Sequence, residues 1–221
     1  MRPIRTTNPT TTTSTNAPAR RRRRIGGLAV TLAAGVALSS AAFGAAPVSA
    51  QPGFGDKTAC PATEIHVKSD QKVVNGTCGD DLIFVGFNNN VTVNAGGGDD
   101  DIRGGWGAGH TVTVNGGAGD DSIHVNPDKR LIADGGGGND DIEGGNADDI
   151  LVGGEGDDHL VGSNGGNVLN GAGGNDILDS TDWGSQAFEA DWVIGGLGHD
   201  VADYQVGDVK DASVESGTAH A

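Results

Sequence analysis

Positive charge is scarce from residue 51 onward. The chain has 221 residues with 14 Lys or Arg and 30 Asp or Glu, and its first fifty residues hold seven of the basic side chains and no acidic one. Without those fifty residues, seven basic and 30 acidic side chains remain, a formal charge of −23. This balance opposes binding to nucleic-acid phosphates and to anionic membranes, and it opposes compaction unless a cation neutralises it. Cations are therefore the first partners that the sequence predicts.

Catalytic signatures are missing as well. No G-x-S-x-G nucleophile motif occurs, and acidic residues follow the glycine runs where a phosphate-binding loop would need a lysine. The only cysteines, Cys60 and Cys78, fit one disulfide in an oxidising compartment, with two free thiols as the alternative. The sequence predicts a non-catalytic protein. The alternative is an extracellular β-solenoid enzyme that acts on polysaccharide.

An export signal is predicted at the N-terminus. The arginine run at 20–24 precedes an apolar stretch at about 25–46, and Val48, Ser49 and Ala50 are small residues of the kind that a signal peptidase reads. We expect residues 1–50 to be a signal peptide cleaved after Ala50, and the mature chain to be secreted without inserting in a membrane. A membrane anchor is the alternative, because the apolar stretch is almost long enough to span a bilayer. Both the Sec and the Tat export routes remain open.

A nine-residue repeat dominates the remaining sequence. Five nonapeptides follow one another without a gap at 135–179, on the template G-G-x-G-x-D-x-U-x with U apolar, and further copies begin at residues 76, 95, 116 and 195. Apolar residues of the repeats fall into pairs whose two members are nine positions apart. From the second member of one pair to the first member of the next, the distance varies from nine to fifteen residues, so only one edge of the structure is kept strictly in register. The pairs of apolar residues nine positions apart are Val74/Ile83, Val93/Ile102, Val114/Ile123, Ala133/Ile142, Leu151/Leu160, Leu169/Leu178 and Val193/Ala202.

This repeat predicts an all-β fold. Each nonapeptide forms a six-residue turn and a three-residue strand whose central apolar side chain points inward. Two nonapeptides make one coil, which predicts a parallel β-roll, a right-handed β-solenoid with terminal caps and about six or seven coils. The expected divisions are an N-terminal cap at 51–73, the roll at 74–179, and a repeat remnant with a cap at 180–221. Four aromatic side chains are predicted to cover the open end of the solenoid as the second cap; the alternative is that they form a platform for a ligand. They are Trp183, Phe188, Trp192 and Tyr204.

The nonapeptides resemble those of the RTX, or hemolysin-type, family of calcium-binding repeats. The resemblance covers residues 76–179 and 195–203. It implies that calcium ions stack between successive turns, bound by the aspartate at the sixth repeat position and by backbone carbonyls. The matching aspartates of the regular edge are Asp81, Asp100, Asp121, Asp140, Asp158 and Asp176, and the carbonyl candidates are Gly98, Gly119, Gly138, Gly156 and Gly174. Typical family members carry a C-terminal signal for type I secretion, which the N-terminal signal predicted here replaces.

Electrostatics predicts the same cation from the residues alone. Stacked coils bring the aspartates within about 5 Å of one another, where two like charges repel by ~3 kcal/mol at an effective dielectric constant near 20. Carboxylate and carbonyl oxygens suit Ca²⁺ better than transition metals or Mg²⁺. Glycine at the first, second and fourth repeat positions is expected to adopt positive φ and to aim carbonyls at the ion. The acids that precede the ligands are expected to stay solvated: Asp80, Asp99, Asp120 and Asp157.

The opposite edge is expected to bind calcium less well. Only the turns before Asp149 and Asn167 keep the pattern there, and together they predict one weaker ion. Asp200 lies beyond an insertion, so its pairing with Asp176 stays open. We expect about five or six Ca²⁺ ions in total, and folding that depends on them. A further alternative is an adhesin whose irregular edge, with Phe87, Trp106 and residues 180–190, binds a cell-surface or matrix partner.

Overall fold

The structure is a computed structural model that describes residues 60–86, 90–104, 109–125, 128–183 and 189–220, all within one compact unit. The predicted signal peptide, residues 51–59 of the predicted N-terminal cap, and Phe87, Trp106 and Phe188 lie outside the described residues. The described residues contain strands and no helix, and hence no helix able to cross a membrane.

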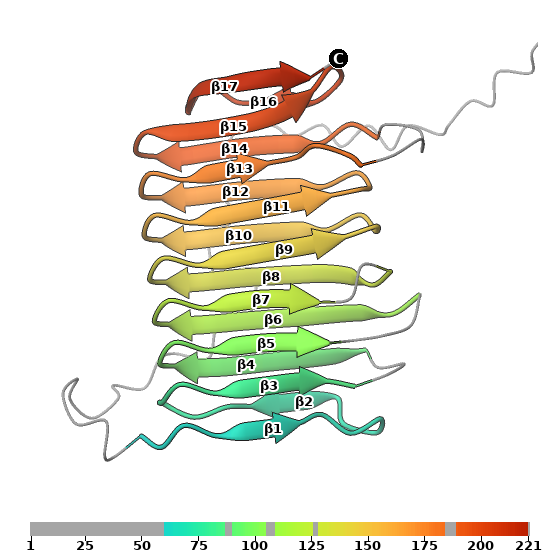
Figure 1. Ribbon diagram of the computed structural model, residues 1–221, viewed down its shortest axis with the longest axis vertical. Helices are drawn as coiled ribbons and strands as arrows, with labels where there is room; N and C mark the ends of the chain where they lie inside the picture. The colour runs from blue at the N-terminus through green and yellow to red at the C-terminus, as the bar shows by residue number, and fades with distance from the viewer. Residues whose placement is uncertain (1–59, 87–89, 105–108, 126–127, 184–188, 221) are drawn as a thin grey trace, which may run out of the picture. The chain divides into compact units, whose positions relative to one another are not determined.

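The strands form two parallel sheets that face each other (Figure 1). One sheet has nine strands in chain order: β1 (Glu64–His66), β3 (Leu82–Val85), β5 (Asp101–Gly104), β7 (Ser122–Val125), β9 (Asp141–Gly145), β11 (His159–Ser163), β13 (Ile177–Asp179), β15 (Asp200–Gln205) and β17 (Val214–His220). The other has eight: β2 (Val73–Asn75), β4 (Val91–Gly97), β6 (Thr111–Ala118), β8 (Arg130–Gly137), β10 (Ile150–Glu155), β12 (Val168–Gly173), β14 (Trp192–Leu197) and β16 (Val209–Lys210). The chain alternates between the sheets, so successive coils stack on one another.

Two columns of aliphatic side chains form the centre of the core between the sheets, and other buried residues such as Val91, Val112 and Leu131 widen it in the N-terminal coils. Each column is aligned residue by residue across the parallel strands, and its members are 4% exposed or less. The first column is Val74, Val93, Val114, Ala133, Leu151, Leu169 and Val193, and the second is Ile83, Ile102, Ile123, Ile142, Leu160, Leu178 and Ala202. The nine-residue pairing predicted from the sequence is confirmed. A core this narrow leaves much of the stability to the turns.

The solenoid extends beyond residues 74–179 in both directions. Ile65 of β1 pairs with Ile83 of β3, so the coil begins within the predicted N-terminal cap. After residue 179, β14 to β17 continue both sheets, which gives about eight turns rather than six or seven. The predicted C-terminal cap is therefore largely solenoid, because Val193 of β14 returns to register beside Leu169 of β12.

The aromatic cap predicted at the C-terminal end does not form from the two described tryptophans. The exposed fraction is 68% for Trp183 and 39% for Trp192, so neither covers the end of the core. Trp192 alternates with buried Val193 along β14, which turns its side chain to the outer face of the sheet. Of the described aromatic residues of this predicted cap, Tyr204 alone packs against the core cluster, and it is partly buried.

Candidate calcium sites in the turns

Seven aspartates form a buried ladder at the regular edge, where the eight-stranded sheet turns into the nine-stranded one. Each lies two residues before an aliphatic member of the second core column, so the strand register stacks them one above another. Their exposed fractions are 2% or less. The ladder consists of Asp81, Asp100, Asp121, Asp140, Asp158, Asp176 and Asp200. The pairing of the Asp200 turn with the Asp176 turn, left open by the sequence, is settled by a hydrogen bond from Asp176 N–H to Asp200 Oδ1 at 3.0 Å.

One oxygen of each carboxylate is used by the backbone of the preceding coil. Asp121 N–H donates to Asp140 Oδ1 at 2.8 Å, and Asp140 N–H donates to Asp158 Oδ1 at 2.8 Å. The same bond recurs from Asp81 to Asp200, with distances from 2.7 to 3.0 Å. This arrangement holds every side chain in one orientation and directs its second oxygen toward its own turn.

The second oxygen has no partner in six of the seven aspartates. The Oδ2 atoms of Asp100, Asp121, Asp140, Asp158, Asp176 and Asp200 are buried and accept no hydrogen bond. A buried carboxylate oxygen without a donor costs at least as much as a lost hydrogen bond, and more when it is charged. The repetition of the same orphaned atom in consecutive turns indicates that a ligand belongs there.

The first glycine of each repeat leaves room for that oxygen. A Cβ added to Gly135 would lie 2.6 Å from Asp140 Cγ and 2.7 Å from the carbonyl oxygen of Gly153 in the next coil. Gly171 is placed in the same way against Asp176 and Gly195. The prediction that the first glycine adopts positive φ is wrong, because the positive-φ residues do not include it. Glycine is needed there for space between the carboxylate and a carbonyl.

The second and fourth glycines do adopt the predicted left-handed backbone. In the repeat at 135–143, φ is 111° at Gly136 and 131° at Gly138. Glycine enters this region without the steric cost that a Cβ carries. Positive φ recurs at the fourth-position carbonyl candidates: Gly98, Gly119, Gly138, Gly156 and Gly174. Among the described residues, no turn hydrogen bond ends on the carbonyl oxygens of those five glycines.

Burial raises the pKa of the ladder carboxyls. The pKa rises to about 8 for Asp121, to about 7 for Asp100 and Asp158, and to about 6 for Asp140 and Asp176. The backbone N–H at Oδ1 lowers each pKa in part, and neighbouring carboxylates raise it further. The charged ladder is therefore unfavourable at neutral pH unless a cation faces it.

The donor set fits calcium. Within the described parts of the chain, no three His, Cys, Asp or Glu side chains converge on a metal site, so a cation in these turns would depend on carboxylates together with carbonyls. Hard oxygen ligands of this kind are the ones that Ca²⁺ accepts in variable number and geometry. Comparison with protein families agrees: the RTX calcium-binding nonapeptide repeat matches in four copies, at residues 113–127, 132–160 and 152–182. The chain carries RTX calcium-binding repeats. No curated protein matches it significantly.

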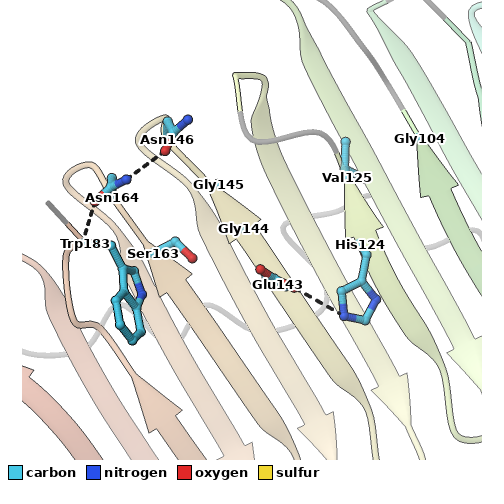
Figure 2. A pocket seen from close by; sticks show the side chains of 10 residues that line it. All are labelled: Gly104, His124, Val125, Glu143, Gly144, Gly145, Asn146, Ser163, Asn164 and Trp183. Atoms are coloured by element: carbon cyan, nitrogen blue, oxygen red, sulfur yellow. Dashed lines mark hydrogen bonds and ion pairs between the residues drawn. The ribbon is translucent and has the colours of Figure 1, made fainter.

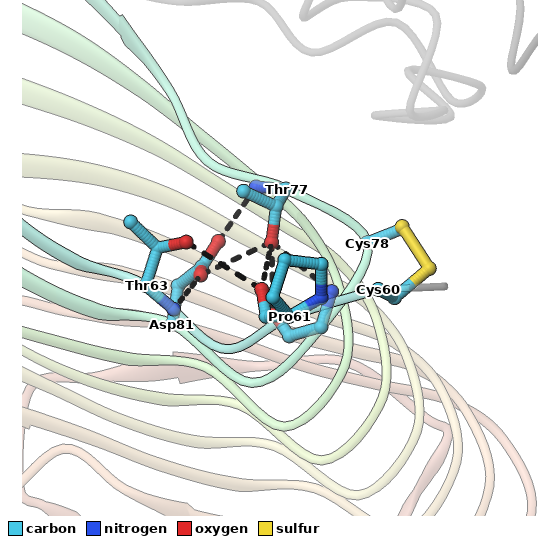
Figure 3. Close-up of a disulfide and its surroundings, with 7 residues drawn as sticks. Cys60, Pro61, Thr63, Thr77, Cys78 and Asp81 are labelled. Atoms are coloured by element: carbon cyan, nitrogen blue, oxygen red, sulfur yellow. Dashed lines mark hydrogen bonds between the residues drawn. A yellow bond between two sulfur atoms is a disulfide. The ribbon is translucent and has the colours of Figure 1, made fainter. Parts of the chain in front are cut away.

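The first RTX turn differs from the turns that follow. Thr77 takes the place of the second glycine, and its N–H donates to Asp81 Oδ2 at 2.6 Å. The Thr77 hydroxyl lies 3.1 Å from Asp81 Oδ1 and 3.4 Å from the carbonyl oxygen of Gly79 (Figure 3). A disulfide between Cys60 and Cys78 ties this turn to the segment before β1. Both oxygens of Asp81 thus have protein donors, unlike those of the later aspartates.

The second edge of the roll, where the nine-stranded sheet turns back into the eight-stranded one, has a shorter inner ladder. The side chains of its first two members have hydrogen-bond partners within the protein. Asp149 accepts the N–H of Leu131 at Oδ1 and that of Gly145 at Oδ2, both at 2.7 Å. The Asn167 amide donates to the carbonyls of Ser163 and Gly165, at 2.9 and 3.2 Å. Neither Asp149 nor Asn167 has a buried side-chain oxygen without a donor that would indicate an ion between them. At this level the Asn167 amide lies against the carbonyls of Ser163 and Gly165.

Two acids of this second ladder escaped the sequence analysis. Asp191 accepts the N–H of Asn167 at 2.6 Å, and Asp208 accepts the N–H of Asp191 at 3.0 Å. Asp191 precedes Val193 by two residues, just as Asp149 precedes Leu151. That offset from the core aliphatic was the signal available in the sequence, and the missing glycines of the insertion concealed it.

A third ladder lies outside the first. The exposed acids Asp80, Asp99 and Asp120 each accept the N–H of the equivalent residue in the next coil, at 2.7 to 3.1 Å, and the series continues through Asn139, Asp157 and Asn175. Their bonds run in the opposite chain direction to those of the buried ladder. These side chains face solvent as predicted, and they also bind each coil to the next.

A hollow of about 430 Å³ opens at the second edge, which is the irregular edge of the sequence pattern. Figure 2 shows Trp183, Asn164 and Asn146 linked along one side of it, with Glu143 and His124 facing them from β9 and β7. The Glu143 Oε2 to His124 Nε2 distance is 3.5 Å. The predicted partner residues Phe87 and Trp106 lie outside the described residues, so the hollow is defined here by other side chains.

Proposed function

We propose that this chain is a secreted protein whose RTX repeats fold when they bind calcium, and that it acts as a non-catalytic structural or interaction module. The observation that carries the proposal is the column of six orphaned Oδ2 atoms on the regular edge. Each faces a turn that protein donors leave unsatisfied, so a divalent cation converts repulsion between the coils into attraction.

Two features of the architecture support a calcium requirement. From Ile142 onward most coils contribute only two fully buried aliphatic side chains, and the ladder carboxyls are held where charge is costly. Ions that bind only the folded chain stabilise it by mass action, so binding free energy becomes folding free energy. The six orphaned oxygens of the regular edge support about six ions, with affinities of ~10⁻⁴ to 10⁻³ M as in other extracellular calcium modules.

The test is circular dichroism of the exported protein. In EGTA we expect a coil spectrum, and in millimolar calcium a β spectrum that appears over a narrow concentration range. Magnesium at the same concentration serves as the control and should leave the coil in place. A β spectrum that is identical in EGTA and in calcium would contradict the proposal.

Secretion has a separate test. The N-terminal sequence of protein recovered from the medium is expected to begin at Gln51, which follows the predicted cleavage site. Retention in the membrane with an intact N-terminus would favour the anchor instead.

A calcium-dependent adhesin is the second candidate. The hollow beside Trp183 favours it, because an exposed tryptophan flanked by amides and a carboxylate is suited to partner recognition. A pull-down from cell-wall material with and without calcium would reveal such a partner. Release of reducing sugar from pectate or alginate by the purified protein would instead favour the enzyme alternative.

A further inference from the structure

Three asparagines that precede a glycine recur at one position of the coil. Asn75, Asn115 and Asn170 lie on β2, β6 and β12, and each is followed by the first glycine of a repeat. Strand register places these three, the column asparagines, in one column of the eight-stranded sheet, where Asn94 lies between the first two. The fourth Asn-Gly pair of the described residues, Asn164–Gly165, lies in a turn outside this column.

An asparagine before a glycine is prone to lose its side-chain amide, because glycine has no Cβ to hinder its own nitrogen and its backbone is the most mobile. The glycine nitrogen attacks the asparagine Cγ and forms the C–N bond of a succinimide ring. The side-chain nitrogen leaves as ammonia with the proton of the glycine N–H. Water then opens the ring at either carbonyl, which gives aspartate or isoaspartate. The attack requires the glycine peptide plane to rotate toward the side chain, so a backbone that cannot rotate is protected.

The folded coil holds the nitrogen of the first pair in place. Gly76 N–H donates to the carbonyl oxygen of Asn94 in the next coil at 2.8 Å. The Asn94 side-chain amide donates to Asn75 Oδ1, also at 2.8 Å. Both the attacking nitrogen and the amide that it would attack are therefore engaged by the neighbouring coil.

The glycines of the other two pairs pack against ladder aspartates of the regular edge. A Cβ on Gly116 would lie 2.6 Å from the carbonyl oxygen of Gly135 and 3.1 Å from Asp121 Cγ. Gly171 is enclosed in the same way, with 2.6 Å from such a Cβ to Asp176 Cγ. The orphaned oxygens of Asp121 and Asp176 are among those proposed to face calcium. An ion that closes these turns therefore also immobilises the reactive nitrogens, and its removal releases them.

We propose that Asn75, Asn115 and Asn170 are sites of self-modification, protected while calcium folds the coil and converted to aspartate or isoaspartate when calcium is withdrawn. This inference goes beyond the proposed function, although it rests on the calcium-dependent folding proposed there. It gives the exported chain a limited lifetime in calcium-poor surroundings, because the return of calcium does not restore the amide.

Modification should impair later folding. Isoaspartate carries the main chain through the side-chain methylene, so the lengthened strand no longer matches the register of its neighbours. Aspartate formed from Asn115 would face Asp134 on the paired strand, where two carboxylates repel. Asn115→Asp should therefore raise the calcium concentration at the folding midpoint. Asn94→Asp is the matched control and should raise it less, because Asn94 is paired with two uncharged side chains, Asn75 and Asn115.

Peptide mass spectrometry of the exported protein tests the inference. Samples are kept at mildly alkaline pH in calcium, in EGTA, and in EGTA with urea, and the loss of each amide is followed with time. In urea the column asparagines should react faster than Asn94, because Ala95 hinders attack there. In calcium their reaction should be slower by at least about tenfold, since it requires a coil to open.

A gain of one site sharpens the test. Ala95→Gly supplies the missing glycine after Asn94 at a column position. The Asn94 amide of this variant should be lost in urea about as fast as that of Asn115, and it should be protected in calcium. Asn115→Gln removes one site and is the control, with unchanged rates at Asn75 and Asn170.

Two results would overturn the inference. One is a set of column asparagines that react no faster than Asn94 in urea. The other is a reaction in calcium as fast as in urea although circular dichroism shows the sample folded. The same spectra report on the proposed function separately: a chain that keeps its β spectrum in EGTA, with its column asparagines protected there but reactive in urea, would refute calcium-dependent folding and leave the modification sites standing.

Discussion

The first turn of the roll and the turns in its middle solve the same problem by different means. At Asp81 a threonine N–H and hydroxyl satisfy the carboxylate, and a disulfide ties the turn to the preceding segment. At Asp140 one oxygen accepts a backbone N–H while the other is buried without a donor. The carboxylate at the N-terminal end of the roll thus has protein donors at both oxygens, whereas those in the middle have a donor at only one. The turn of Asn167 on the second edge resembles the first turn, because the Asn167 amide donates hydrogen bonds to the carbonyls of Ser163 and Gly165, where a cation would otherwise be needed.

Acidity should change the middle turns most. Folded-state pKa values of about 6 to 8 lie above the value of about 3.9 for an unfolded aspartate, so the calcium-free fold binds more protons than the unfolded chain across that range. The contribution of these protonated carboxyls to the free energy of unfolding is therefore fully present below about pH 4 and is lost as pH rises toward about 8. Chain stripped of calcium on a chelating resin should gain β structure when taken from about pH 8 to about pH 5.

With calcium present the pH dependence should reverse, because protons compete with the ion for the same carboxylates. The calcium concentration at the folding midpoint should rise as pH falls. For the calcium-free chain, a circular dichroism spectrum that does not change between about pH 8 and about pH 5 would show that the carboxyls of the middle turns are not buried.

Removing one charge should separate the two kinds of turn. Asp140→Asn should reduce the number of ions taken up on folding by about one, measured as the slope of the logarithm of the folding constant against the logarithm of free calcium. Asp81→Asn should leave that slope unchanged and lower the free energy of unfolding by about 1–3 kcal/mol at saturating calcium, because an amide N–H would oppose the Thr77 N–H. Equal slopes in the two variants would remove the distinction.

The first turn should be convertible into a middle turn. Thr77→Gly removes the hydroxyl at Asp81 Oδ1 and permits the positive φ of the later turns, in which no N–H bonds to the aspartate Oδ2. We therefore expect one additional calcium ion by calorimetry and a loss of about 1 kcal/mol in the calcium-free state. Thr77→Ser keeps the hydroxyl and is the control, with no additional ion. No gain of an ion in Thr77→Gly would mean that the disulfide-linked segment, rather than Thr77, prevents binding.

The smallest expected effect concerns a strained turn residue. Ala172 takes the second glycine position with φ at 77°, where a side chain costs about 1–2 kcal/mol. Ala172→Gly should therefore raise the free energy of unfolding in calcium by about 1 kcal/mol, measured by urea titration. Gly154→Ala introduces a Cβ at the equivalent position of the preceding coil and should lower it. A destabilised Ala172→Gly would be contrary to this account.

Much of the fold could be predicted because the repeat is local. Strand, turn and inward-facing side chain all recur every nine residues, so the aliphatic columns and the Asp81 to Asp176 series follow from counting. The extent of the roll could not be predicted, since β14 to β17 lack a continuous nonapeptide run and join the sheets only by register. Asp191 was missed for that reason, and the first glycine was assigned to backbone conformation although it is required for space.

The sequence by itself determined the period, the acidity and the residues that face the core, because these depend on neighbours along the chain. Only the tertiary structure decided which oxygens have donors. Asp81 and Asp140 occupy the same repeat position, and what distinguishes them is whether an N–H of their own turn reaches the second oxygen, as Thr77 N–H does at Asp81. That contact depends on the backbone conformation of the turn in three dimensions, so it separates the turn whose carboxylate has protein donors at both oxygens from those in which one oxygen has none.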